Sequence, residues 1–261
     1  MINGKNIVLT GASSGIGLEV LKLLVKGEDN RILAVSRHAV EKLTDFAPNV
    51  TAFDADVSSP EGIESIFDKA ESMFEKIDIF YANAGFPYYE RYDYLDWERV
   101  EKMFRTNTFA PMYTYSRYLK HLNGRDGHLA ITVSAIGQMA VPGYAVYSAS
   151  KFATQGFQQA VRVEKPKNLK MTCLYPVATD TNFFVVANEA DFEKPFPVQQ
   201  PDVVARKMVA GIENNKKYVS PCGLFALSKV LMGVCPPIRD IYWKLEYNKL
   251  VRMEKRLAKE K

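Results

Sequence analysis

The stretch TGASSGIG at residues 10–17 follows the apolar run NIVLT and precedes LEVLKLLVKG at 18–27. An apolar run, a glycine-rich loop and an amphipathic segment, in that order, are what a phosphate site between a strand and a helix requires. Glycines let the backbone approach a pyrophosphate, and the free N–H groups at the helix start face the anion. The spacing Gly11-x3-Gly15-x-Gly17 matches neither the GxGxxG fingerprint nor the GxxxxGK[ST] loop. A tight turn would use the same glycines, but the context favours nucleotide binding.

Short apolar runs recur along the chain, separated by longer amphipathic stretches. Continuous Val, Ile and Leu are typical of strands buried on both faces, and their alternation with helices predicts right-handed crossovers. We therefore predict an α/β, single-domain Rossmann fold, with a doubly wound, mostly parallel sheet of about seven strands and helices on both faces. The expected strands lie at 6–10, 31–36, 50–56, 77–83, 128–134, 169–175 and 216–220.

The composition is that of an ordinary globular protein, with 261 residues, of which 47% are hydrophobic and 25% charged. The net charge of +4 is confined to residues 244–261, which hold seven Lys or Arg and three Glu, so the remainder is formally neutral. Because Glu is interspersed, this tail favours a solvated helical face over a phosphate or membrane contact. We predict no nucleic-acid partner.

The N-terminal residues MINGKNIVLT lack the long apolar core of a secretory signal, and no stretch reaches the apolar length of a membrane span. Cys173, Cys222 and Cys235 are an odd number without CxxC or Cys/His spacing, so we expect neither a disulfide framework nor a metal site. These features predict a cytoplasmic setting, with membrane association left open by the C-terminal residues.

Residues 221–261 form an apolar and then basic extension beyond the last expected strand. We assign residues 1–220 to a dinucleotide-binding catalytic domain that includes a substrate loop at 182–200, and we treat the extension as part of the same domain. The apolar residues of 221–243 could close the substrate pocket, pack against another subunit or lie on a membrane surface. Pro236 and Pro237 should break any single helix across this segment.

The pentapeptide YSASK at 147–151 places a tyrosine and a lysine four residues apart. On a helix, Tyr147 and Lys151 share one face, where an ammonium would favour the phenolate and lower the tyrosine pKa. Such a pair would make a proton donor usable near neutral pH, although the same spacing is common among surface residues. Tyr144 is a rival donor, but it lies seven residues, about two turns, from Lys151.

Further motifs follow the glycine loop in a fixed order. They are Asp56-Val57, Asn83-Ala84-Gly85, Asn107 within RTNTFA, and Ser134 thirteen residues before Tyr147. Each alone has a structural explanation, such as a helix cap, a turn or a strand-end hydroxyl that bonds its own backbone. Together with T-G-x-x-x-G-I-G, the series resembles the short-chain dehydrogenase/reductase family over roughly residues 5–220.

The resemblance implies an oxidoreductase that interconverts a carbonyl and an alcohol by hydride transfer from a nicotinamide cofactor, and a homodimer or homotetramer. In such an enzyme Tyr147 protonates the carbonyl oxygen, Lys151 lowers the Tyr147 pKa and holds the nicotinamide ribose, and Ser134 orients the substrate oxygen. Asn107 would position a water that connects Lys151 to solvent. The implied cofactor-binding residues are Gly11, Ser13, Ser14, Gly15, Ile16, Gly17, Ser36, Arg37, Asp56, Val57, Asn83, Ala84, Gly85, Tyr147, Lys151, Pro176, Thr179 and Thr181.

The end of the second expected strand discriminates between the two nicotinamide cofactors. A carboxylate there pairs with the ribose hydroxyls of NAD, whereas a guanidinium accepts the 2′-phosphate of NADP. The sequence has Ser36, Arg37 and His38 without Asp or Glu, so we predict NADP (NADPH) and consider NAD less suited. A solvent-exposed salt bridge is the alternative use of Arg37.

One segment departs from the family pattern. In YPVATDT at 175–181, Val177 stands where the family has a glycine and Thr179 where it has a valine. Pro176 and Thr181 still match, so we expect this segment to contact the nicotinamide carboxamide, with a backbone geometry that the loss of the glycine makes harder to predict.

The apolar segment NFFVVANEADFEKPFPVQQ at 182–200 occupies the family's substrate-loop position. With the apolar extension, it predicts a hydrophobic ketone or alcohol: lipid-like, steroid or otherwise bulky. The expected substrate-binding residues are Ser134, Gln138, Tyr147, Phe183 and Phe184, with Met139 and Phe86 as further candidates. Two other functions account for less of the pattern: an NADP-binding regulatory or redox-sensing protein, and a peripheral membrane protein that uses the fold as a scaffold.

Overall fold

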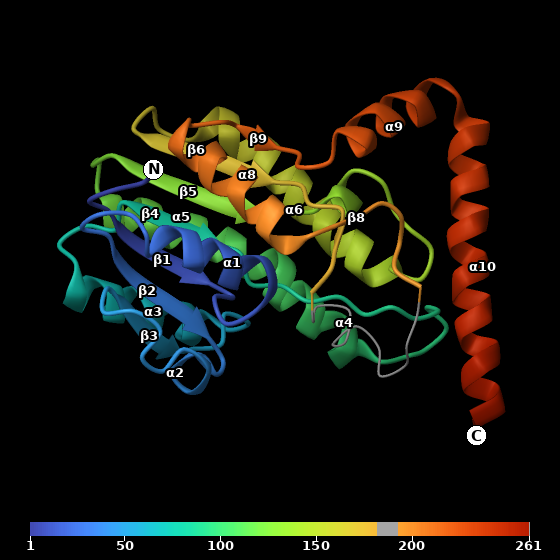
Figure 1. Ribbon diagram of the computed structural model, residues 1–261, viewed down its shortest axis with the longest axis horizontal. Coiled ribbons are helices and arrows are strands. Elements are labelled where there is room, and N and C mark those ends of the chain that lie inside the picture. Colours follow the sequence, from blue (N-terminus) through green and yellow to red (C-terminus); the bar gives the residue numbers. More distant parts are fainter. Residues whose placement is uncertain (182–192, 261) are drawn as a thin grey trace.

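The structure, a computed structural model, describes residues 1–181 and 193–260. In this part of the chain the centre is a sheet of seven parallel strands in the order β3-β2-β1-β4-β5-β6-β9 (Figure 1). A second sheet pairs two short parallel strands, β7 (Ala178–Thr179) and β8 (Val198–Gln199). The main strands are β1 (Asn6–Thr10), β2 (Arg31–Ser36), β3 (Val50–Asp54), β4 (Ile79–Ala82), β5 (Gly127–Thr132), β6 (Leu169–Leu174) and β9 (Tyr218–Val219).

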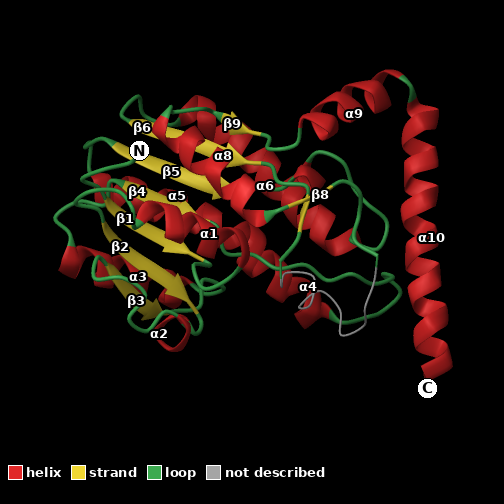
Figure 2. Cartoon of the chain, in the orientation of Figure 1, coloured by secondary structure: helices red, strands yellow, loops and turns green. Residues whose placement is uncertain are grey.

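Helices cover both faces of the sheet (Figure 2). One face carries α1 (Gly15–Leu24) and α8 (Pro201–Glu213), and the other carries α3 (Pro60–Met73), α5 (Ala110–Leu122) and α6 (Ala145–Glu164). This arrangement confirms the predicted doubly wound, single-domain α/β fold. The remaining helical elements are α2 (Ala39–Lys42), α4 (Trp97–Phe104), a π-helical turn (Arg105–Phe109), a 3-10 turn (Ala135–Gly137), α9 (Gly223–Val234) and α10 (Pro236–Glu260).

All seven predicted strands occur, although several end earlier than their apolar runs. The run 128–134 continues as a strand only to Thr132, because Ser134 has a φ of 116° that a strand does not tolerate. The run 50–56 ends at Asp54, whose Oδ1 accepts a hydrogen bond from the Val40 N–H of α2 at 2.9 Å. Both strands therefore end earlier than predicted at the carboxyl edge of the sheet, where the chain continues into loops.

Two hydrophobic clusters explain why the strand sequences are apolar without alternation. Under α3, α5 and α6, Phe67 stacks on Phe80 with ring centroids 5.1 Å apart. Under α1 and α8, Leu24 and Met208 lie in the cluster of the opposite face. A strand such as β1 therefore buries successive side chains on both sides, and each fully buried aliphatic side chain contributes about 1.5–3 kcal/mol.

The strand order reverses between β1 and β4, and in such sheets ligands bind in the crevice at the carboxyl ends of the strands. Asn83, just beyond β4, ties these ends together. Its Nδ2 donates to the Thr10 carbonyl at 3.1 Å, and its Oδ1 accepts from Thr132 Oγ1 at 3.0 Å. These hydrogen bonds link the carboxyl ends of β1, β4 and β5 at the base of the crevice.

The C-terminal residues form two helices, α9 and α10, which meet at Cys235 (Figure 1). The helix break predicted at Pro236 and Pro237 therefore occurs, with α10 beginning at Pro236. Leu250 and Met253 of α10 pack in a cluster with Tyr89 and Met103 of the body. No helix in residues 1–181 and 193–260 combines the length and the apolar character needed to cross a membrane. The division of the chain at residue 220 stays a prediction.

Candidate active site

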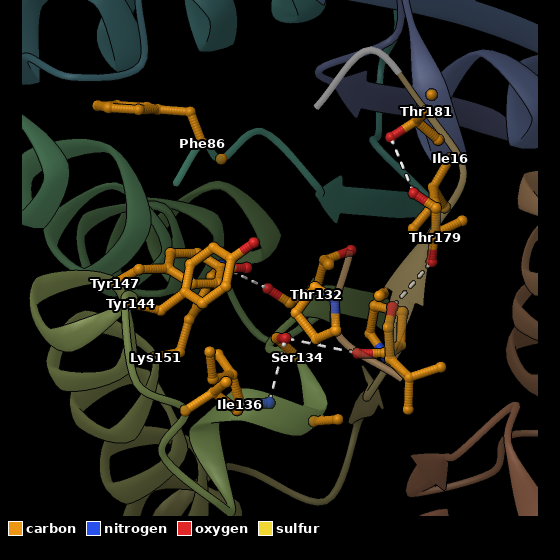
Figure 3. Close-up of a pocket in the computed structure, with 18 of the residues that line it drawn as sticks. Ile16, Phe86, Thr132, Ser134, Ile136, Tyr144, Tyr147, Lys151, Thr179 and Thr181 are labelled. Atoms are coloured by element: carbon orange, nitrogen blue, oxygen red, sulfur yellow. Dashed lines mark hydrogen bonds between the residues drawn. The ribbon is translucent and has the colours of Figure 1, made fainter. Parts of the chain in front are cut away.

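A cavity of about 490 Å³ lies at the carboxyl ends of β1, β4, β5 and β6 (Figure 3). It brings the glycine loop together with the segment after β4, the end of β5 and the start of α6. The predicted site residues that line it are Gly11, Ser14, Gly15, Ile16, Gly17, Arg37, Asn83, Ala84, Gly85, Ser134, Tyr147, Lys151, Pro176, Thr179 and Thr181.

The glycine loop can exist only with glycine at its tightest points. Gly11 has a φ of 68°, and a Cβ there would lie 2.9 Å from the Ala84 Cα. A Cβ on Gly17 would lie 2.0 Å from the Gly11 carbonyl oxygen, well inside van der Waals contact. The side chain of Ser14, the N-cap of α1, makes no capping hydrogen bond. The loop thus presents backbone and the start of a ten-residue helix to the cavity.

Ser134 is held in a strained backbone conformation at the cavity wall. Its φ of 116° and ψ of 148° fall in a region that residues other than glycine seldom adopt, at a cost of about 1–3 kcal/mol. Hydrogen bonds from its own N–H to the Leu174 carbonyl (3.2 Å) and from Ala135 N–H to the Pro176 carbonyl (2.9 Å) hold it there. The Ser134 Oγ accepts a hydrogen bond from the Ile136 N–H at 3.3 Å and donates one to the Pro176 carbonyl at 3.4 Å (Figure 3).

Tyr147 and Lys151 lie one turn apart on α6, as their spacing predicts, and both are buried. The Lys151 Nζ is 5.9 Å from the centroid of the Tyr147 ring and donates a hydrogen bond to the Thr132 carbonyl at 3.1 Å. Burial lowers the pKa of Lys151 to about 7. Burial raises the pKa of Tyr147 above its ordinary value, and a hydrogen bond from Ser134 partly offsets this. Burial is thus the largest influence on the Tyr147 pKa in this structure, and the expectation that Lys151 lowers it stays a prediction.

Asn107 lies in the π-helical turn between α4 and α5, and its side chain is buried. Its Nδ2 donates to the Phe86 carbonyl (2.9 Å) and its Oδ1 accepts from the Phe86 N–H (3.1 Å). Asn107 and Lys151 also line a second cavity of about 10 Å³, on the order of the volume one water requires. A Cβ on Gly85 would lie 3.0 Å from Asn107 Oδ1 and 3.5 Å from Lys151 Nζ, so glycine at this position leaves room for both side chains beside the backbone.

Comparison with known proteins agrees with this geometry. The model of the short chain dehydrogenase family matches residues 5–191, which is more than half of the chain. The chain belongs to the short-chain dehydrogenase family. It is 25% identical over 264 residues to 11-beta-hydroxysteroid dehydrogenase 1A of Arabidopsis thaliana, covering 94% of this chain and 76% of that protein. It is 28% identical over 258 residues to 3-dehydrosphinganine reductase of Danio rerio, covering 90% and 76% respectively.

Solved structures of short-chain dehydrogenases share the fold. A Burkholderia phymatum enzyme in complex with NAD superposes with a TM-score of 0.78 at 17% identity, covering 92% of this chain and 97% of that one. An alcohol dehydrogenase from Thermococcus sibiricus, complexed with 5-hydroxy-NADP, gives a TM-score of 0.71 at 24% identity, covering 83% and 95%. Both nicotinamide cofactors therefore occur among the neighbours of this dehydrogenase.

Tyr144 of the dehydrogenase lies at the N-cap of α6 and lines the same cavity as Tyr147. The two rings lie side by side with centroids 6.1 Å apart (Figure 3). Unlike Tyr147, Tyr144 has a buried hydroxyl that finds no hydrogen-bond partner in the described part of the chain. Burial raises its pKa far above the ordinary value, so the group stays protonated.

The cavity lining includes two cations, of which one was predicted from the sequence. Arg37 follows β2, and Lys42 ends α2; both line the cavity. Neither forms an ion pair with any residue of 1–181 or 193–260. The salt bridge considered as an alternative for Arg37 is therefore not formed within these residues. Lys42 was missed because it lies on a short helix rather than at the strand end.

Several predicted residues do not line the large cavity. Gln138 instead accepts a hydrogen bond from Lys229 of α9 through its Oε1 at 3.0 Å. Asp56 accepts from the Ser58 N–H at 2.9 Å in a local turn after β3. Phe183 and Phe184 lie outside the described residues. The other predicted residues away from this lining are Ser13, Ser36, Val57 and Asn107, of which Val57 and Asn107 line the small cavity.

The C-terminal helices supply cavity residues that the sequence did not single out. Of the three uses considered for the extension, a place at the pocket is the one that these contacts support. Cys222 and Phe225 form a cluster with Ala135, against which Val177 packs, so the valine that replaces the family glycine fills space beside α9. The lining residues from this region are Leu224, Phe225, Ser228, Met232 and Tyr242.

Proposed function

We propose that this dehydrogenase is NADP(H)-dependent and interconverts a carbonyl and an alcohol on a hydrophobic substrate, with Tyr147 as the acid and base. The observation that carries the proposal is the convergence of Ser134, Tyr147 and Lys151 on one cavity that also reaches the glycine loop. A regulatory NADP-binding protein would need the loop but not the other three residues.

In the reduction direction, the Tyr147 hydroxyl donates its proton to the carbonyl oxygen while Ser134 donates a hydrogen bond that stabilises the developing charge. Burial keeps Tyr147 protonated before this step, because it raises the pKa of the phenol. The phenolate that remains favours the charged form of Lys151, whose pKa burial holds near 7. Proton uptake by the pair follows through the small cavity beside Asn107, which would hold the connecting water. Bound NADPH would supply the hydride.

The residues of the cofactor end fit a dinucleotide with a 2′-phosphate. The loop at Gly11 and Gly17, which has no room for a Cβ, and the start of α1 would hold the diphosphate. Arg37 and Lys42 would hold the 2′-phosphate with charge-assisted hydrogen bonds, each worth about 1.5–3 kcal/mol. Replacing both by Glu should therefore lower kcat/KM for NADPH at least tenfold, with a much smaller change for NADH. A wild-type preference for NADH would overturn the cofactor assignment.

The substrate end supports a bulky apolar ketone or alcohol. Apolar side chains line this end of the cavity: Phe86, Ile136 and Met139 of the body, and Phe225 and Met232 of α9. Relatives named for steroid and sphinganine substrates are consistent with this class.

The deciding experiment is NADPH oxidation with steroids, long-chain keto compounds, quinones and small aldehydes. Tyr147→Phe should lower kcat about 10²- to 10⁴-fold while NADPH still binds. Tyr175→Phe is the matched control, because its hydroxyl bonds Gln155 at 2.8 Å away from the cavity. Retained turnover in Tyr147→Phe would refute the mechanism. NADPH binding without turnover of any carbonyl would favour the regulatory protein.

A further inference from the structure

The outer face of α9 is an exposed apolar stripe. Its side chains recur at helical spacing and are between 49% and 81% exposed. The stripe consists of Leu224, Leu227, Val230, Leu231 and Val234. The opposite face of the same helix, with Phe225, Ser228 and Met232, lines the cavity. A helix that covers a pocket needs one apolar face, so the second apolar face requires a separate explanation.

The outer face of α10 is cationic. At 100° per residue, Lys244, Arg252, Lys255, Arg256 and Lys259 fall within an arc of about 120°, together with the exposed Ile241 and Leu245. No carboxylate falls on this arc: Glu246 and Glu254 lie on the side that packs on the body, and Asp240 and Glu260 lie about 40° beyond its two edges. Of the five cations only Arg252 forms an ion pair within the described residues, with Glu193 at 3.0 Å.

We propose that α9 and α10 form a docking face for an anionic lipid bilayer, with the α9 stripe inserted among the acyl chains and the α10 cations at the headgroups. Apolar area and basic residues each add to such binding, and each Lys or Arg close to an anionic surface strengthens it about fivefold. A second copy of this chain is the other occupant to consider. A two-fold interface would bring the cationic faces together, and their repulsion disfavours it.

The stripe is continuous with the cavity. Leu224 belongs to both, since it is half exposed on the outer face and also lines the cavity. An apolar substrate could therefore pass from the bilayer into the cavity beside Leu224 without crossing water. This route rests on the proposed function, whereas docking itself does not.

The test is flotation of the full chain with vesicles of phosphatidylcholine alone or mixed with phosphatidylglycerol. We expect binding to the anionic vesicles that weakens as salt is raised. Leu227→Glu with Leu231→Glu should weaken it at least tenfold, as should Lys255→Glu with Arg256→Glu. Neither leucine lines the cavity, so turnover of a water-soluble ketone reports separately on the proposed function. Val163→Glu, on α6 at an 88% exposed position, is the matched control.

Three results would overturn the proposal. The first is no flotation with either vesicle by wild-type protein. The second is flotation that the α9 substitutions leave unchanged while circular dichroism shows the variants folded. The third is a dimer in solution that dissociates in the Leu227→Glu, Leu231→Glu variant without vesicle binding by wild type, which would show that a second copy covers the stripe.

Discussion

Without cofactor, the Lys151→Met variant should have a larger free energy of unfolding than the wild-type protein at low pH, and this difference should shrink as the pH rises. The folded Lys151 releases its proton near pH 7, because burial lowers its pKa, whereas an unfolded lysine holds its proton to about pH 10.4. Between these values the unfolded chain binds more protons, so wild-type stability rises with pH through this window. The difference corresponds to at most about 4–5 kcal/mol.

The substitution also removes the hydrogen bond to the Thr132 carbonyl, worth about 1 kcal/mol. We therefore expect Lys151→Met to exceed wild type by about 3–4 kcal/mol near pH 6 and to lose this advantage near pH 10. Urea unfolding of both proteins across this range measures the difference directly. Lys102→Met, at an exposed position of α4, should track wild type. A stability difference that does not change with pH would refute the reasoning.

Three further substitutions test individual features of the site. Gly17→Ala should weaken cofactor binding at least tenfold, because its Cβ would meet the Gly11 carbonyl oxygen at 2.0 Å. Gly156→Ala, which has open space around it on α6, is the control: it should leave cofactor binding unchanged and stabilise the fold by up to about 1 kcal/mol. Equal cofactor affinities of the two variants would contradict the loop geometry. Tyr144→Phe removes a buried hydroxyl without a described partner and should raise the Tm of the cofactor-free protein by a few degrees in calorimetry, and a lower Tm would show that the hydroxyl is satisfied. Ser134→Gly should be more stable to urea than Ser134→Ala by about 1–3 kcal/mol, since only glycine relieves the φ of 116°, while both lose turnover; the reverse order would argue against strain.

The fold was predictable because burial on both faces of a parallel sheet leaves continuous apolar runs in the sequence. Where the chain leaves the sheet, the runs mislead: 128–134 reads as one strand, yet the backbone turns at Ser134. The positive φ of Ser134 is maintained by backbone hydrogen bonds to Leu174 and Pro176, which are distant in the sequence. The residue type at position 134 therefore does not predict this torsion.

Within the candidate site, local pairs were predictable and distant ones were not. Tyr147 and Lys151 meet because one helix carries both, so their spacing suffices. Asn107 lies in a π-helical turn that no periodicity indicated and lines the small cavity together with Lys151, and only the family resemblance singled it out. The balance of influences on the Tyr147 pKa depends on burial, which the pentapeptide does not encode.

The C-terminal extension was the least predictable part. An apolar stretch has the same composition whether it lines a pocket, packs on a subunit or contacts lipid, so its use depends on what lies opposite each face. The predicted homodimer or homotetramer, the cytoplasmic setting and the domain boundary at residue 220 stay predictions.

The small sheet of β7 and β8 has a consequence for how this enzyme can change. Ala178 pairs with Val198 and Thr179 with Gln199, and the Asp180 N–H adds a bond to the Gln199 carbonyl at 2.8 Å. These pairs hold the two ends of the intervening segment together beside the cavity, which Ala178 and Thr179 line. Doubling the length of a fastened segment costs only about 0.6 kcal/mol in closure entropy. Residues can therefore be inserted or replaced between the two strands at little cost in closure entropy, while the strand pairing keeps Ala178 and Thr179 in place.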